Sequence, residues 1–557
     1  MARGVLRNDI MRRCVFAWLA LLSATAGMAQ TSGFLLGVDY SEPAPSNVSQ
    51  IATDSSGALY MFSVCALNPP SGCVTKLSAD GKTILWQNSL GFDVQAMAVD
   101  PSGGVYVIPF QPGDTLVYVA KLGARGTGIA WKTLAASGVA TGMASLAADS
   151  QGRTYVAVPS SSQSYVSEVV RLNAAGSAVD YTAQIAGGTN AIAVDGSGAA
   201  YVSGYTSETT FLERLAPDGS AGFSVPTQAG GWLAVNANGD VVVYGTVYTG
   251  ASASGLLQRF DSTGAITQTT AAPGGGSGLA LDAAGNAYIE GASPDLLIPV
   301  MNSLATCGSH WIGVFAPDGS LLQKTYIPGA ANVQPTGPMT TGPNSTVFVV
   351  VPPDVLVQLS PNANAQTFPL ACLGNSATYA TGPIAPGGFV TLFGNGLGPQ
   401  QGVLTQASPQ SPYPTQTANV QVTFDGTPAP LLWVQDQQVN VVAPWSLTPG
   451  QTTQVCVTYN TVKTNCLTSQ VAQTAPAVFT VDGTYAAALN QDGTINSADN
   501  PAPLNSTVTV FATGLGPINP PQADGTVVGL PLPTNVLPVT VYSPFFTPIG
   551  AKISIST

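Results

Sequence analysis

A short stretch that recurs through most of the chain constrains the fold more than any other feature. LALDAAGNAYIEG (279–291) has near copies in MAVDPSGGVYVIP (97–109) and IAVDGSGAAYVSG (192–204). Further copies are IATDSSGALYMFS, LAADSQGRTYVAV, LAVNANGDVVVYG and a degenerate MTTGPNSTVFVVV, which makes seven. One position recurs in phase, as Asp54, Asp100, Asp149, Asp195, Asn236, Asp282 and Gly342, at steps of 46, 49, 46, 41, 46 and 60 residues. Periods of this length are typical of solenoids and propellers.

Each copy predicts a hairpin. An apolar strand leads into a turn in which Asp caps its own backbone and Gly takes a positive φ, and a strand centred on Tyr follows. A second hairpin is expected in each unit around KLSADG, KLGARG, RLNAAG, RLAPDG, RFDSTG, VFAPDG and QLSPNA. Four short strands per unit predict a propeller blade, because such a sheet buries both faces only against its neighbours in a ring. The sequence therefore predicts an all-β chain with a seven-bladed β-propeller at 50–372. Residues 30–49 are expected to form a linker or a propeller-closing segment.

At these residues the chain resembles the secreted bacterial β-propellers of NHL and SBBP repeat type. The sixth copy is the most similar to the SBBP pattern, through GNAYIEGASPDLLIPVMNSL and IGVFAPDGSLLQKTYIPG. The resemblance implies a propeller but no single activity, because propellers host lyases, hydrolases and binding platforms alike.

A different repeat follows the propeller. FVTLFGNGLGP (389–399) returns as VTVFATGLGP (508–517), and VQVTFDG, PLLWVQDQQVNVVAPW and QVCVTYN alternate between them as strands do. This predicts immunoglobulin-like β-sandwich modules at 373–480 and, in shortened form, at 481–557. The pattern resembles IPT/TIG domains and an uncharacterised C-terminal domain of exported bacterial propeller proteins, which implies attachment or display. Because the second module lacks strands, we expect Ile553 and Ile555 on a poorly covered edge strand through which chains self-associate.

The N-terminus predicts export. Arg-rich MARGVLRNDIMRRC precedes the apolar VFAWLALLSATAG and small residues at 27–29, so 1–29 are expected to be a signal peptide, with Met1 or Met11 as the start. No later apolar run reaches the length of a membrane-spanning helix. Removing four Arg and one Asp changes the formal net charge from −12 to −15, which argues against nucleic acid as a partner. The expected location is secreted or at the cell surface.

Six cysteines remain after the signal peptide, and an even number in an exported chain indicates disulfides. Proximity pairs Cys65 with Cys73 and Cys456 with Cys466. Elimination leaves Cys307 for Cys372.

Candidate catalytic and metal-binding residues are few. His310 is the only histidine and is expected to be a neutral loop residue near Cys307. A carboxylate pair drawn from Glu168, Glu208, Glu213 and Glu290 would suit a lyase or glycan hydrolase at the mouth of the central channel. The stretch LNQDGTINSAD (489–499) resembles a calcium loop in Asn490, Asp492, Asn496 and Asp499, but Ala488 stands where the first carboxylate belongs. A hairpin turn is the stronger interpretation of that stretch, and no cofactor is expected.

The repeated Asp54, Asp100, Asp149, Asp195, Asn236 and Asp282 are expected to cap turns rather than to bind a ligand. The sequence therefore favours an exported, non-enzymatic binding or display protein whose propeller face takes an unknown protein or glycan. The propeller enzyme is the alternative.

We predict that reductant lowers the melting temperature by several degrees while chelator leaves it unchanged, because short disulfide loops each contribute ~2–3 kcal/mol. Thermal unfolding with dithiothreitol or with EDTA measures both effects. A melting temperature that falls with EDTA and is insensitive to dithiothreitol contradicts both halves.

Overall fold

The computed structural model describes residues 35–540, except for 45–46, 68–69, 111–112, 114, 138–143, 160–165, 250–251, 273–275, 293–299, 309, 328–337, 352–353, 366, 482–484 and 530. The expected signal peptide and the expected edge residues Ile553 and Ile555 lie outside the described residues. The described chain is all-β apart from the short 3-10 helices Ala124–Gly126 and Pro343–Ser345. None of its helices is long and apolar enough to cross a bilayer.

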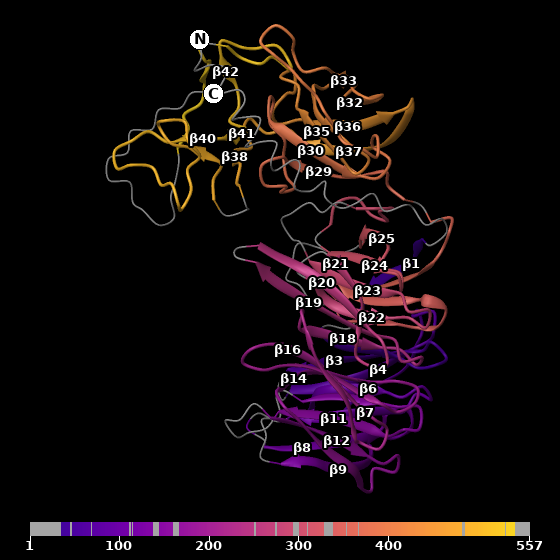
Figure 1. Ribbon diagram of the computed structural model, residues 1–557. Helices are drawn as coiled ribbons and strands as arrows, with labels where there is room; N and C mark the ends of the chain where they lie inside the picture. The colour runs from indigo at the N-terminus through magenta and orange to yellow at the C-terminus, as the bar shows by residue number, and fades with distance from the viewer. Residues whose placement is uncertain are drawn as a thin grey trace.

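Seven four-stranded antiparallel sheets occupy most of the chain (Figure 1). The first two are β2 (Val48–Thr53), β3 (Leu59–Leu67), β4 (Pro70–Leu77), β5 (Ile84–Ser89) and β6 (Asp93–Val99), β7 (Val105–Phe110), β8 (Leu116–Leu122), β9 (Ile129–Ser137). The third and fourth are β10 (Ser145–Ala148), β11 (Thr154–Pro159), β12 (Ser167–Leu172), β13 (Val179–Ile185) and β14 (Gly188–Val194), β15 (Ala200–Tyr205), β16 (Thr210–Leu215), β17 (Ala221–Thr227). The fifth and sixth are β18 (Gly231–Val235), β19 (Val241–Thr249), β20 (Ser252–Phe260), β21 (Ile266–Ala272) and β22 (Gly276–Leu281), β23 (Ala287–Ala292), β24 (His310–Phe315), β25 (Leu321–Tyr326).

The seventh sheet joins the two ends of the ring. It combines β26 (Met339–Thr341), β27 (Val347–Val351) and β28 (Val355–Pro361) with the N-terminal strand β1 (Leu36–Pro43), which pairs antiparallel with β28. The first strands of successive sheets contact one another in order, and β26 contacts β2. The sheets therefore form a closed circuit, which is the architecture of a propeller. Residues 36–43 belong to this ring and are not a linker.

The two ends of the ring differ. At one end, the turn end, the first and second strands of every sheet are joined by a five-residue turn whose first N–H donates to the carbonyl of its last residue. The turns are 54–58, 100–104, 149–153, 195–199, 236–240, 282–286 and 342–346. At the other end, the loop end, the connections between second and third strands vary in length. They are 68–69, 111–115, 160–166, 206–209, 250–251, 293–309 and 352–354.

The turn aspartates hold neighbouring sheets together. Asp100 Oδ1 accepts the backbone N–H groups of Ser102 (2.8 Å) and Gly104 (2.9 Å). Its Oδ2 accepts the Tyr106 hydroxyl at 2.9 Å, and that hydroxyl also lies 3.2 Å from the carbonyl oxygen of Gly152 in the next sheet. The side chain that caps the turn therefore also positions the phenol that links one sheet to the next.

Apolar side chains fill the space between sheets. Tyr60 and Phe62 of the first sheet pack against Val105 and Val107 of the second, and all four are buried. Alternate residues of each second strand face opposite neighbours, which explains why these strands are apolar on both sides.

A β-sandwich follows the propeller and lies beyond β24 and β25 of the sixth sheet in Figure 1. One sheet contains β29 (Leu370–Asn375), β30 (Phe389–Gly394), β35 (Gln438–Val442), β34 (Leu431–Val434) and β31 (Val403–Leu404), in that order. The other contains β33 (Thr427–Pro428), β32 (Val420–Phe424), β36 (Thr452–Tyr459) and β37 (Val462–Gln470). Leu392, Val422, Phe424 and Val441 are fully buried between them. The strand β29 belongs to the sandwich, so the propeller ends before the expected boundary at 372.

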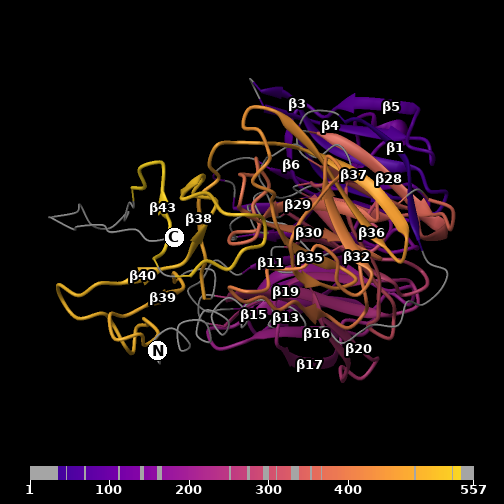
Figure 2. The ribbon, with the colours of Figure 1, turned by 90° about the horizontal axis from the view of Figure 1, so that it is seen from above.

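The last segment differs from the expected second sandwich. In its described residues, the only strands are the two-residue pairs β38 (Ala477–Val478) with β41 (Ala512–Thr513), β39 (Ala488–Leu489) with β40 (Thr509–Val510), and β42 (Ile518–Asn519) with β43 (Thr534–Asn535). This segment lies beside the first sandwich (Figure 2). The backbone N–H of Phe389 donates to Thr513 Oγ1 and that of Trp445 to Asp524 Oδ1, both at 2.8 Å. Contacts with the sandwich, rather than long strand ladders of its own, therefore order this segment.

The structure contains three disulfides. Cys65–Cys73 links β3 to β4, and Cys456–Cys466 links the paired strands β36 and β37. Cys307–Cys372 joins the connection between β23 and β24 of the sixth sheet to β29 of the sandwich. At the same junction Tyr326, Cys372 and Phe393 are buried together. The propeller and the sandwich are thus held together covalently and by apolar contact.

We predict that Tyr106→Phe lowers the free energy of unfolding by ~1–3 kcal/mol, because it leaves a buried carboxylate without one of its hydrogen-bond donors. Chemical denaturation of the full chain measures the change. Tyr459→Phe, in the sandwich, is the matched control and should cost less. Equal stability of Tyr106→Phe and the unsubstituted chain would show that the phenol does not link the sheets.

Candidate functional site

Four side chains form a recurring stack between neighbouring sheets at the turn end. Each stack contains a turn carboxylate, a tyrosine of the second strand, a cation of the third strand and an aromatic ring of the fourth. The members are Asp54, Tyr60, Lys76 and Trp86; Asp100, Tyr106, Lys121 and Trp131; Asp149, Tyr155, Arg171 and Tyr181; and Asp195, Tyr201, Arg214 and Phe223.

The first stack shows the geometry. Lys76 Nζ lies 3.1 Å from Asp54 Oδ2 and 4.7 Å from the centroid of the Tyr60 ring, and the Tyr60 and Trp86 rings meet edge to face at 6.0 Å. Burial raises the pKa of Asp54, but hydrogen bonds from Ser56, Lys76 and Tyr60 outweigh it and hold that pKa below its ordinary value. The carboxylate is therefore charged and saturated with donors, which suits a structural role.

The fourth-strand ring covers a glycine of the next sheet. Trp86 lies over Gly126 and Trp131 over Gly176, in the turns between third and fourth strands. Tyr181 lies over Gly219, where a Cβ would come within 2.5 Å of the ring, and Phe223 lies over Gly264 at 2.7 Å in the same sense. Gly264 has a φ of +87°, so both the backbone and the ring above it require glycine.

The fifth sheet departs from this pattern at three of the four positions. Asn236 replaces the carboxylate, Val242 the tyrosine and Gln268 the aromatic ring, while Arg259 keeps the cation. Arg259 Nη1 donates to Gly285 O at 2.8 Å and Nη2 to Ala316 O at 3.0 Å, both in the sixth sheet. Burial lowers the pKa of the Arg259 guanidinium, whose Nη1 and Nη2 donate to backbone carbonyls while Nε has no hydrogen-bond partner among the described residues.

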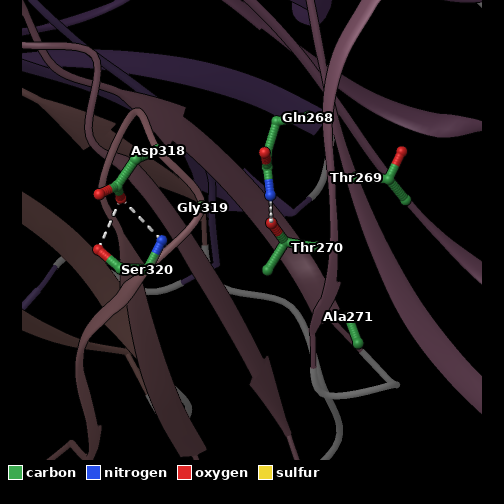
Figure 3. A pocket seen from close by; sticks show the side chains of 7 residues that line it. All are labelled: Gln268, Thr269, Thr270, Ala271, Asp318, Gly319 and Ser320. Carbon is green, nitrogen blue, oxygen red and sulfur yellow. Dashed lines mark hydrogen bonds between the residues drawn. The ribbon is translucent and has the colours of Figure 1, made fainter. Parts of the chain in front are cut away.

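A pocket of about 380 Å³ lies where the ring is missing (Figure 3). It lies between β21 and the turn that joins β24 to β25, and it is lined by Gln268, Thr269, Thr270, Ala271, Asp318, Gly319 and Ser320. Asp318 Oδ1 accepts the backbone N–H of Ser320 at 2.9 Å and its hydroxyl at 2.6 Å. These bonds hold the pKa of Asp318 below its ordinary value, so the pocket carries a negative charge. We take this pocket as one candidate binding site.

The turns of the two hairpins in each repeat did not predict this pocket. The signal lies in the fourth strands, where WQN, WKT, YTA and FSV are followed by QTT at the same register.

Glu290 is a second unusual group. It lies fully buried in β23, its Oε2 accepts the Ser277 hydroxyl at 2.5 Å, and its Oε1 has no hydrogen-bond partner among the described residues. Burial raises the pKa of Glu290 to about 7, against the opposing effect of the Ser277 bond.

The other three glutamates lie apart from Glu290. Glu168 accepts a hydrogen bond from Gln184 Nε2 (2.7 Å) on the outer strands of the third sheet, and Glu208 is exposed in a loop of the fourth. Glu213 lies in β16, where burial raises its pKa. Within the described part of the chain, no hydrogen bond joins two of these four carboxyl groups.

His310 was expected in a loop but is the first residue of β24 and is fully buried. Burial lowers its pKa, which favours the neutral imidazole.

The calcium candidates lie in a hydrogen-bonded turn. Asp492 Oδ1 accepts the Thr494 N–H (2.9 Å) and hydroxyl (2.7 Å), and Asn496 Nδ2 donates to Asn490 Oδ1 at 2.8 Å. Asp499 is exposed. Over the described ranges, no three His, Cys, Asp or Glu side chains come close enough together to hold a metal ion.

Comparison with known proteins identifies one domain. Residues 375–474 match the IPT/TIG domain. No curated protein is similar enough in sequence to count as a relative.

Solved structures resemble the chain only distantly. The hydrazine synthase of Kuenenia stuttgartiensis has a TM-score of 0.41 and 11% identity over 57% of this chain and 95% of its own. The Dos1 propeller has a TM-score of 0.38 and 9% identity over 58% and 79%. The Pan2 WD40 domain of Neurospora crassa has a TM-score of 0.35 and 13% identity over 57% and 90%. The propeller assignment here therefore depends on the closed circuit of sheets.

We predict that Glu290→Gln removes a pH dependence of stability. The folded-state pKa is above the ordinary value of 4.5, so the folded protein retains a proton that the unfolded chain releases as the pH rises from 4.5 to about 7. The free energy of unfolding therefore falls across this window, by about 3 kcal/mol in total, and remains low above it.

Denaturation at a series of pH values compares Glu290→Gln with the unsubstituted chain, and Glu168→Gln, at a partly exposed glutamate of β12, is the control. The free energy of unfolding of Glu290→Gln should exceed that of the unsubstituted chain by an amount that grows as the pH rises. A difference that does not change with pH would mean that Glu290 ionises normally.

Proposed function

We propose that this protein is an exported, non-enzymatic binding protein of the NHL/SBBP repeat type. Its propeller serves as the ligand platform at the loop end of the ring. Its IPT/TIG sandwich and C-terminal segment serve as the attachment region.

The observation that carries this proposal is a pair of exposed aromatic residues at the loop end of neighbouring sheets. Tyr205 ends β15 of the fourth sheet with 36% of its surface exposed, and Trp232 lies at the start of β18 of the fifth with 42% exposed. Aromatic side chains that remain exposed on a rigid framework are common anchors in binding surfaces. The loops around them differ in length from sheet to sheet, as recognition loops on a constant scaffold do.

The junction with the sandwich supports a display role. The Cys307–Cys372 disulfide fixes the sandwich to the sixth sheet, so the propeller is held in one orientation on its attachment region. Three disulfides also suit an oxidising, extracellular environment, which agrees with export.

The alternative is a lyase or glycan hydrolase that acts through carboxylates at the channel mouth. Glycoside hydrolysis ordinarily uses two carboxyl groups on either side of the scissile bond. Glu290 is paired with Ser277 and buried between strands, which favours the binding protein over the enzyme.

We predict that Trp232→Ala weakens ligand binding at least about tenfold, because it removes an exposed aromatic side chain that the ligand would cover on binding. The full chain is immobilised and screened against arrays of glycans and of extracellular proteins, and each retained ligand is analysed by mass spectrometry. Leu504→Ala, a highly exposed residue of the C-terminal segment, is the control and should bind normally.

Recovery of the ligand with its mass unchanged supports a binding protein. A ligand that is cleaved or eliminated supports the enzyme instead. Equal retention by Trp232→Ala and the unsubstituted chain would exclude the loop end as the binding face.

A further inference from the structure

The gap between the fifth and sixth sheets has lost the ring that fills the corresponding gap in four other places. The third residue of the fourth strand is Trp86, Trp131, Tyr181 or Phe223 in the first four sheets and Gln268 in the fifth. In those four sheets the ring covers a turn glycine of the next sheet.

Gly319 keeps the geometry that a covering ring requires. Its φ is +82°, close to that of Gly264, and a Cβ there would come within 2.5 Å of both Gln268 Nε2 and Thr270 Oγ1. The Gln268 and Thr270 side chains, which are joined by a hydrogen bond of 3.4 Å from Nε2 to Oγ1, therefore cover Gly319 where the first four sheets place a ring. The pocket beside them, of about 380 Å³, is a shallow depression that is open to solvent.

The lining of the pocket indicates what chemistry it accepts. Gln268 offers an amide, Thr269, Thr270 and Ser320 offer hydroxyls, and Asp318 offers a carboxylate. Asp318 Oδ1 is occupied by Ser320, whereas its Oδ2 has no hydrogen-bond partner among the described residues. Walls of this kind suit a ligand with many hydroxyl groups more than an aromatic side chain, because a hydroxyl can donate to the carboxylate and accept from the amide.

The charge of the pocket disfavours anionic ligands. No basic side chain lines it, and Arg259, the nearest cation in the stack, donates to carbonyls of the sixth sheet. Arg259 is close enough to help lower the pKa of Asp318, but it does not line the pocket, so an anionic ligand would meet the Asp318 carboxylate first.

We propose that the pocket between β21 and the β24–β25 turn binds a neutral pyranose ring of a glycan. The sugar ring lies against the Gln268 and Thr270 side chains that cover Gly319, and its hydroxyl groups bond with Asp318 Oδ2 and the Gln268 amide. This site lies at the turn end of the propeller and is separate from Tyr205 and Trp232 at the loop end.

The test refills the gap with the ring that the other sheets carry. Gln268→Trp restores the arrangement of Trp131 over Gly176, in which a threonine two residues later, Thr133, is also present. The full chain is titrated by calorimetry with neutral hexasaccharides of glucose, mannose, xylose and N-acetylglucosamine, and with a tryptophan-containing peptide. Thr182→Trp, at the position of β13 that corresponds to Thr269, is the matched control for an added surface tryptophan.

We expect at least one hexasaccharide to bind, Gln268→Trp to abolish that binding without lowering the melting temperature, and Thr182→Trp to leave it unchanged. Asp318→Asn should weaken the affinity about tenfold, which reports on the carboxylate even if Gln268→Trp folds poorly. Trp232→Ala should have no effect on this binding, so the outcome is independent of the loop-end proposal.

Three results would overturn the proposal. The first is that no hexasaccharide binds. The second is that Gln268→Trp and Asp318→Asn both bind the sugar as tightly as the unsubstituted chain does. The third is that the chain binds the tryptophan peptide and none of the sugars.

Discussion

The capped turn between the first two strands of each sheet is the contact on which the propeller depends. A carboxylate such as Asp54 is almost fully buried, and burying it without partners would cost several kcal/mol. It is instead surrounded by two backbone N–H groups, a serine hydroxyl, a phenol and an ammonium group. Because the phenol also reaches the Gly103 carbonyl of the next sheet, a local turn requirement becomes a link between sheets. The same link recurs in the second and third sheets, where Tyr106 reaches the Gly152 carbonyl and Tyr155 reaches the Gly198 carbonyl.

The propeller could be predicted from sequence because its signal is local and repeated. Asp, Gly and Tyr at fixed offsets define a hairpin, and in-phase copies require a closed arrangement that buries both faces of each sheet. The closing strand carries no such signal. Leu36 pairs with Pro361, which lies at the other end of the propeller sequence, and nothing in LGVDYSEP indicates that partner. The sequence did not predict that β29 belongs to the sandwich, for a similar reason. Leu370–Asn375 directly follows the last repeat but pairs with Phe389–Gly394.

In the candidate sites, too, local features could be predicted from the sequence and features that depend on packing between sheets could not. Glu290 could be selected as an acidic residue, but its burial and raised pKa depend on packing between sheets. His310 was expected in a loop because the cysteine nearby suggested one, whereas strand pairing with β23 places it in a sheet. The pocket beside Gln268 needed only an alignment of the fourth strands, so the information was in the sequence. The shortened C-terminal segment was misjudged because a returning GLGP motif indicates a similar turn and does not guarantee the strands of a sandwich.

The Cys307–Cys372 bond also determines how tension passes through the molecule. If the C-terminal segment is anchored and the ligand pulls on the propeller, the load reaches Cys372 within β29 and crosses directly to Cys307. The chain between these two residues contains β24 to β28, including the strands that close the ring with β1. This segment bears none of the load while the bond is intact. The bond thus carries the force past these strands, and the seam of the propeller, which is held only by noncovalent contacts, is shielded from the force that attachment would impose.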